Sequence, residues 1–269
     1  MLNLKDPSLL KTQNFIDGQW ADGGAGTIDV TNPANGEAVA TVANGNAADA
    51  VRAVEAAAEA FKSWSNIPAK QRAVLLRNWY DLLIANADDL GAIMTAEQGK
   101  PLAESIAEVG SGASFIEYYA EESKRVLGAT IPTIASDRRL QTYKQPVGVV
   151  GCITPWNFPN AMIARKAGPA LGSGCTIVIK PATETPLSAL AMCELADRAG
   201  IPKGVISVVV GNNSREIGAV LTQHPKIGKF TFTGSTPVGK TLMKQCADGV
   251  KKVSLELGGN APFIIFDDA

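Results

Sequence analysis

A carboxylate between two leucines is the residue of this sequence best suited to chemistry. Glu256 lies in the segment Val253-Ser-Leu-Glu-Leu-Gly-Gly-Asn260, just before a pair of glycines. A carboxylate in apolar surroundings holds a proton more strongly than one in water, which suits a general base working near neutral pH. Glu256 is therefore predicted to act as a base, and a base needs a partner group.

A turn between two prolines contains a second candidate residue. In Thr154-Pro-Trp-Asn-Phe-Pro159 the prolines stiffen the chain and leave Trp156 and Asn157 at the tip. The amide of Asn157 could stabilise a developing oxyanion. An asparagine that merely suits a tight turn is the alternative, and these six residues do not decide between the two.

Two further segments are typical of nucleotide contacts. Lys180-Pro-Ala-Thr183 places a lysine within reach of a ribose hydroxyl or a phosphate, with an ordinary surface lysine as the alternative. In Phe232-Thr-Gly-Ser-Thr-Pro-Val-Gly239, Ser235 or Thr236 can cap a helix whose first turn holds Pro237. Such a helix start can bind a pyrophosphate, although no Gly-x-Gly-x-x-Gly motif follows the first strand.

Apolar strands that alternate with helices must position these segments. Strands are predicted over 147–153, 176–179, 205–210, 230–233 and 252–257, with helices over 160–172, 187–199, 214–222 and 237–247. This alternation predicts an α/β fold with a Rossmann-like parallel sheet flanked by helices, whose ligands bind at the carboxyl ends of the strands. The candidate residues follow the strands, as that rule requires.

The first half of the sequence carries no visible chemistry. Short strands are predicted over 15–42, followed by a helical region with three helices: one around 51–61, one that starts at Pro68, and one that starts near Pro101 and passes Tyr118. Residues 138–146 are predicted to contain an exposed, alternating strand. These patterns predict packing surfaces.

Composition excludes several classes of function. The formal charge of -1 argues against nucleic acid or an anionic membrane as a partner, and no apolar run approaches the roughly 18 residues that span a bilayer. Four separated cysteines and the lack of a signal sequence favour a cytoplasmic protein with reduced thiols. The single histidine, His224, is expected to be exposed in a polar turn. A single histidine in such a turn makes a Ser-His-Asp triad unexpected and cannot form a multi-histidine metal site, so no metal is expected.

In order and spacing, these four motifs resemble those of the aldehyde dehydrogenase superfamily, and the resemblance runs from about residue 14 to the end of the chain. It implies that Asn157 is the oxyanion-hole amide and that Glu256 is the base that activates water. It also implies a cofactor site for NADP or NAD, with Lys180 on the adenosine ribose. The matching cofactor positions are Thr154, Pro155, Trp156, Asn157, Lys180, Pro181, Ala182, Thr183, Gly234, Ser235 and Leu257.

Two positions within the resemblance bear on specificity. Many NAD-preferring members carry a glutamate where this chain has Thr183, and that glutamate would repel a 2′-phosphate. Thr183 removes the repulsion, with Lys180 nearby as a cation, so we expect NADP to be accepted. Arg165, eight residues after Asn157, matches the arginine that holds the substrate carboxylate in succinate-semialdehyde dehydrogenases. The segment Glu97-Gln-Gly-Lys-Pro-Leu102 resembles the same subgroup, and a surface-helix arginine is the alternative.

The family reaction needs a cysteine thiolate that attacks the aldehyde. In relatives that cysteine would fall beyond Ala269, and Cys152, Cys175, Cys193 and Cys246 are expected to be buried structural residues. The chain is therefore expected to be truncated before the catalytic domain and to be inactive alone. Three parts are expected: N-terminal strands and helices of the cofactor-binding domain (1–137), a partial oligomerisation segment without its partner strand (138–146), and a Rossmann-like NAD(P)-binding domain (147–269).

The leading interpretation is an NAD(P)-dependent enzyme that, when complete, oxidises succinate semialdehyde to succinate and forms a homo-oligomer. A dinucleotide-binding module without catalysis is the alternative from another class. A dehydrogenase of another aldehyde, such as glutarate semialdehyde or a neutral aldehyde, is the third. Composition and motifs leave these three open.

Overall fold

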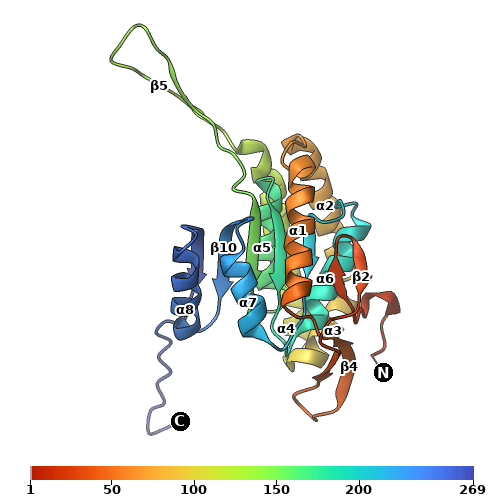
Figure 1. Ribbon diagram of the computed structural model, residues 1–269. Coiled ribbons are helices and arrows are strands. Elements are labelled where there is room, and N and C mark those ends of the chain that lie inside the picture. Colours follow the sequence, from red (N-terminus) through yellow and green to blue (C-terminus); the bar gives the residue numbers. More distant parts are fainter. Residues whose placement is uncertain (1) are drawn as a thin grey trace.

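A seven-stranded sheet forms the centre of the protein, in a computed structural model that describes residues 2–269 (Figure 1). Its strand order is β11-β10-β7-β8-β9-β1-β2. The first five of these strands are parallel to their neighbours, whereas β1 and β2 join antiparallel at the other edge. The bounds are β1 Asn14–Ile16, β2 Gln19–Ala21, β7 Val149–Ile153, β8 Thr176–Lys180, β9 Ile206–Val208, β10 Ile227–Thr233 and β11 Lys252–Glu256.

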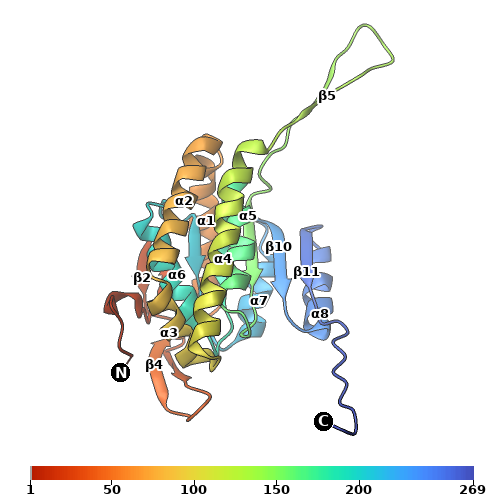
Figure 2. The same cartoon turned by 180° about the vertical axis from the view of Figure 1, so that it is seen from behind.

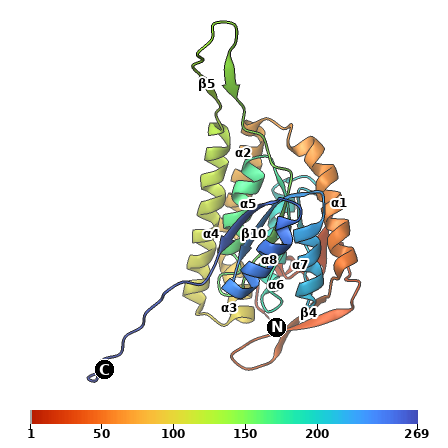
Figure 3. The same cartoon turned by 60° about the vertical axis from the view of Figure 1, so that its left-hand side comes forward.

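Helices cover both faces of this sheet. One face carries α1 (Ala47–Trp64), α7 (Ser214–Gln223) and α8 (Thr236–Ala247), and Figure 3 shows α7 and α8 side by side. The other carries α5 (Ala161–Gly172) and α6 (Pro186–Arg198), with further helices packed outside them (Figure 2). These outer helices are α2 Ala69–Ala85, α3 Ala87–Gln98 and α4 Leu102–Glu122.

Alternation along the buried strands fills two cores. On β7, Val149 packs with α1, α7 and α8, whereas Val150 and Cys152 pack with α5, α6 and α2. Successive side chains of a strand point to opposite faces, so a strand covered on both sides is apolar throughout. β7 and β8 have this character, which explains why continuous apolar runs identified them.

The predicted fold class is confirmed. Each predicted strand and helix from residue 147 onward is present, with bounds that shift by up to three residues. The helical region contains one helix more than predicted: α3 follows α2 after the single residue Asn86, which serves both helix ends. Two short N-terminal strands, β3 (Thr27–Thr31) and β4 (Ala38–Ala43), form a separate antiparallel pair.

The exposed segment 138–146 contains a strand, as predicted, and this strand has a neighbour that was not predicted. Its strand β6 (Leu140–Thr142) has a partner within the chain, β5 (Ala129–Ile131), and the two form an antiparallel ribbon. This ribbon projects well beyond the helices (Figure 1), and Ile134 at its tip is fully exposed. β5 was not predicted, because it is only three residues long and has no apolar periodicity. The expected loss of an oligomerisation partner strand stays a prediction.

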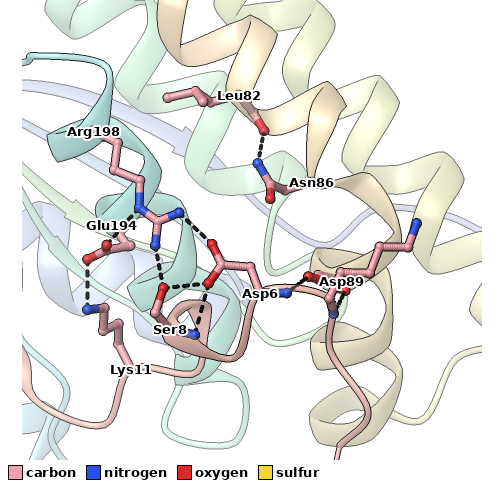
Figure 4. A network of polar contacts seen from close by, with 9 residues as sticks. Asp6, Ser8, Lys11, Leu82, Asn86, Asp89, Glu194 and Arg198 are labelled. Atoms are coloured by element: carbon pink, nitrogen blue, oxygen red, sulfur yellow. Dashed lines mark hydrogen bonds and ion pairs between the residues drawn. The ribbon is translucent and has the colours of Figure 1, made fainter.

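A polar network fastens the N-terminal segment to the helical layer (Figure 4). The Arg198 guanidinium donates to Asp6 and Ser8, and Asp89 on α3 accepts from the backbone of Lys5 and Asp6. The hydrogen bond from Arg198 lowers the pKa of Asp6 to about 2. A short segment without a core of its own is thereby held against α3 and α6.

The side chain of His224 is less exposed than its place in a polar turn predicted. His224 was expected to be exposed, but its side chain is only 15% accessible and its Nε2 lies 3.4 Å from Glu55. Burial lowers the pKa of His224.

Within residues 2–269, no helix has both the length and the apolar character needed to cross a membrane.

Candidate active site

Parallel pairing brings the candidate segments to one edge of the sheet. The register sets Ile153 beside Lys180 and beside Phe232, and Thr233 beside Glu256. The residues that follow β7, β8, β10 and β11 therefore share the carboxyl edge, where open α/β sheets bind their ligands. Order along the sheet differs from order along the chain, so segments far apart in sequence become neighbours.

The turn between the two prolines leaves its tip in solvent. Trp156 is 54% accessible and Asn157 is exposed, whereas Thr154 is buried and its backbone N–H donates to the Lys180 carbonyl at 3.2 Å. The start of the turn is thus tied to the neighbouring strand. Its tip is free to meet a ligand.

Glu256 ends β11 and belongs to a chain of polar contacts. Its Oε1 lies 3.4 Å from Nη1 of Arg165, and its Oε2 accepts a hydrogen bond of 3.0 Å from the Thr233 hydroxyl. Lys166 Nζ donates to the same hydroxyl at 2.7 Å. Arg165 and Lys166, which are adjacent on α5, thus both interact with the Glu256 carboxylate: Arg165 directly and Lys166 through the Thr233 hydroxyl.

The expected apolar enclosure of Glu256 is absent. Its side chain is 52% accessible, because it lies at the end of an outer strand of the sheet, where only long α5 side chains extend toward it. Flanking leucines predicted burial, but alternation along β11 turns them to the opposite side from the glutamate. Arg165, at 43% accessible, also packs over the Phe115 ring at 4.8 Å.

A cleft of about 630 Å³ contains seven of the predicted site residues. Asn157, Arg165 and Glu256 line it together, along with Pro155, Trp156, Gly234 and Leu257. A neighbouring cleft of about 830 Å³ shares Arg165 and Glu256 and lies between α5 and the outer strands β10 and β11. An amide, a guanidinium and a carboxylate in one hollow can bind an anionic group and act on an adjacent polar one.

Other predicted positions do not line this cleft: Thr154, Lys180, Pro181, Ala182, Thr183 and Ser235. Lys180 is buried, its Nζ donates to the Pro181 carbonyl at 3.0 Å, and burial lowers its pKa to about 8. The alternative of an ordinary surface lysine was therefore wrong. The Thr183 hydroxyl donates to the Gly211 carbonyl at 3.1 Å.

The predicted helix after Gly234 begins at Thr236, with Ser235 as its N-cap residue and a proline in its first turn. Within the described residues, the Ser235 side chain makes no capping hydrogen bond, so its oxygen does not occupy the helix start. Gly234 N–H donates to the Glu256 carbonyl at 3.1 Å. A Cβ at Gly234 would lie 2.5 Å from the Phe232 ring, so this close approach needs glycine.

Burial excludes the four cysteines as exposed nucleophiles, as predicted. All of them are free and buried, and burial raises the pKa of Cys193 and raises that of Cys152 to about 12. A thiol reacts as its thiolate, which burial disfavours.

Several side chains that support the site were not predicted from the sequence. Lys166 and Thr233 connect to Glu256, and Lys100 and Glu108 contact the turn that carries Asn157. The motif 97–102 contains Lys100, and it was noted only for its resemblance. These contacts join residues that are far apart in the sequence, so local patterns do not reveal them.

Glu97, the first residue of that motif, lies in α3, and its buried side chain contacts the N-terminus of α6. Its carboxylate accepts from the backbone N–H groups of Leu187 and Ser188, at 2.7 and 2.8 Å, and from the Ser188 hydroxyl. Burial raises the pKa of Glu97 to about 7, and these hydrogen bonds oppose the rise. Glu97 thereby joins α3 to α6 behind the site.

Replacing Glu97 with glutamine is expected to cost about 1–3 kcal/mol at pH 5, because an amide cannot accept all three hydrogen bonds. Between the usual pKa of 4.5 and about 7, the folded protein keeps a proton that the unfolded chain has released. The stability contributed by Glu97 is therefore complete below pH 4.5 and lost as the pH rises through 7. Urea unfolding at pH 5 and pH 8 should give a smaller cost at pH 8; a larger one would mean that Glu97 is ionised in the fold.

Comparison with known proteins shows the family of this chain. The family model described as "Aldehyde dehydrogenase family" matches residues 20–269, and the chain belongs to this family. It is 60% identical to a 3-sulfolactaldehyde dehydrogenase of Pseudomonas putida and 56% identical to a glutarate-semialdehyde dehydrogenase of Pseudomonas aeruginosa. It is 54% identical to the NADP⁺-dependent succinate-semialdehyde dehydrogenase of Escherichia coli. Each match covers 100% of this chain and 55–56% of the relative, so the chain spans about half the length of these curated relatives.

Solved structures of aldehyde dehydrogenases superpose closely on this chain. An aldehyde dehydrogenase from Brucella melitensis biovar abortus superposes with a TM-score of 0.96 at 57% identity, over 100% of this chain and 56% of that one. A betaine aldehyde dehydrogenase of Staphylococcus aureus in complex with NAD⁺ superposes with a TM-score of 0.92 at 38% identity, over 97% and 53%. Aldehyde dehydrogenases use NAD(P), which places this chain in an oxidoreductase family.

Proposed function

We propose that the complete protein oxidises a small aldehyde bearing an anionic group, with succinate semialdehyde as the leading substrate and NADP or NAD as the hydride acceptor. One observation supports this proposal above all: Asn157, Arg165 and Glu256 line the same cleft. Glutarate semialdehyde and a sulfonated aldehyde fit the same chemistry, since relatives are named for each. In all three cases the guanidinium would hold the distal anion.

In this proposal Asn157 donates to the oxygen of the aldehyde as it gains charge, and Glu256 takes a proton from the water that hydrolyses the acyl intermediate. The nucleophile would come from a part of the complete protein outside this chain. Lys166 and Thr233 would keep the carboxylate of Glu256 oriented through the hydrogen bonds described above. NAD(P) supplies the hydride acceptor when bound.

We also propose roles for the regions of the chain. Residues 147–269 would form the NAD(P)-binding part, supported by the N-terminal strands and helices of residues 1–137. The ribbon that includes residues 138–146 would contribute to a homo-oligomer, as its exposed Ile134, Leu140 and Tyr143 suggest. A dinucleotide-binding role for this chain alone remains the alternative, since its four cysteines are buried.

The substrate class can be tested in an extended protein, defined as this chain continued through the aligned second half of the Pseudomonas putida relative. Replacing Arg165 with alanine there is expected to raise KM for succinate semialdehyde about 10- to 100-fold, because a charge-assisted contact is lost. KM for an uncharged aldehyde of similar length should change little. Arg125→Ala, an exposed arginine at the far end of the larger cleft, is the control. Equal losses on both aldehydes would refute the role of Arg165.

Cofactor choice can be tested on this chain and on the extended protein by titrating NAD and NADP separately. We expect NADP to bind at least as tightly as NAD. Replacing Thr183 with glutamate should weaken NADP about tenfold or more relative to NAD, because a carboxylate within about 5 Å repels a 2′-phosphate. Thr183→Gln is the uncharged control of equal size. Clearly tighter NAD binding by the unaltered protein would contradict the expectation.

A further inference from the structure

The turn that carries Asn157 is held by side chains from the junction of α3 and α4 and from α4 itself. Gln98 ends α3, and Lys100 lies in the loop before α4. Lys100 Nζ donates to the backbone carbonyl of Asn157 at 3.0 Å, and Gln98 Nε2 approaches the same oxygen at 3.4 Å. The tip of the turn is thus anchored through its backbone, which leaves the Asn157 side chain free.

Glu108 on α4 completes the arrangement. Its Oε2 pairs with Lys100 Nζ, and its Oε1 accepts from the backbone N–H groups of Asn160 and Ala161, at 3.0 and 3.1 Å. These are the first amides of α5, so Glu108 also caps the helix that follows the turn. One ion pair therefore fixes both the carbonyl of Asn157 and the start of the helix that carries Arg165.

Burial makes this pair unusual in the protein. The side chains of Lys100 and Glu108 are 10% and 3% accessible, and Lys100 Nζ lies 4.2 Å from the centre of the Phe158 ring. A buried ion pair pays a large desolvation cost and often adds little net stability. Its value here is geometric, because a rigid anchor keeps a side-chain amide within the fraction of an ångström that oxyanion stabilisation needs.

We propose that Lys100 and Glu108 are positioning residues that set the Asn157 amide for catalysis through the backbone of the turn. This inference rests on the proposed role of Asn157. It gives a function to the motif 97–102, whose lysine lies 57 residues before the asparagine that it contacts.

The test is a double-mutant cycle in the extended protein. Lys100→Met should lower kcat about 10- to 100-fold with KM for NAD(P) unchanged, a smaller loss than removal of the amide itself. In the Asn157→Ala background, Lys100→Met should cause no further loss, because its effect passes through that amide. Lys11→Met is the matched control: it breaks a partly buried Lys–Glu pair, with Glu194 at 3.0 Å, far from the turn. It should leave kcat unchanged.

The possible outcomes distinguish the positioning role of Lys100 from the proposed catalytic role of Asn157. If Asn157→Ala lowers kcat but Lys100→Met does not, or if the two losses multiply, the positioning role is refuted and the role of Asn157 stands. If Asn157→Ala leaves kcat unchanged, the proposed function fails at Asn157, and the positioning role fails with it. Should Lys100→Met not fold, Lys100→Arg keeps the charge beside Glu108 but moves the donor, and the same cycle applies.

Discussion

Replacing Glu256 with glutamine in the extended protein is expected to lower kcat about 10²- to 10⁴-fold, the range of a lost general base. Glutamine keeps the size of the side chain and a hydrogen bond to Thr233, but its amide cannot take a proton from water. The fold should tolerate the change, because the side chain is half exposed on an outer strand. Thermal unfolding midpoints of the two proteins should therefore agree closely.

Rapid-mixing kinetics can show which step is lost. Hydride transfer precedes hydrolysis of the acyl intermediate, so Glu256→Gln should still give a burst of NAD(P)H near one equivalent per site, followed by slow turnover. Glu122→Gln is the control, a carboxylate that lines the far end of the larger cleft and pairs with Arg125. A variant with neither burst nor turnover would place Glu256 in the first chemical step and contradict its assignment to hydrolysis.

Elements buried on both sides of the sheet could be predicted from sequence. β7 and β8 are continuous apolar runs because both of their faces are covered, and α5 to α8 follow such strands in a regular alternation. α3 was missed because Asn86 alone separates it from α2 and Gly91 interrupts its pattern. β5 was missed because a three-residue strand, stabilised only by pairing with β6, has no period to detect.

In the candidate site, too, some features could be predicted from the sequence and others could not. Asn157, Arg165 and Glu256 were identifiable because each belongs to a motif with a specific local pattern or a family resemblance. The exposure of Glu256 was not, because flanking leucines do not reveal that β11 has a neighbour on one side only. Contacts such as Lys166 with Thr233, separated by 67 residues, depend on strand order, which sequence patterns do not encode.

Asn157 carries the second large expected effect. Replacing it with alanine in the extended protein should lower kcat about 10²- to 10³-fold, as expected when one donor to a developing oxyanion is removed. Its backbone carbonyl remains bound to Lys100, so the turn should keep its course without the amide. KM for NAD(P) should change far less than kcat, because this donor acts on charge that develops in the transition state.

Introducing a negative charge at the same position sharpens this test. Asn157→Asp keeps the shape of the side chain but sets a carboxylate where the oxyanion would form, so its kcat should fall below that of Asn157→Ala. Asn66→Ala, which removes an asparagine bonded to the Lys62 carbonyl at the end of α1, is the control with no path to the cleft. Steady-state kinetics on the three variants separate the possibilities. If alanine and aspartate lower kcat equally, the side chain only shapes the turn, and the oxyanion must be stabilised by other donors.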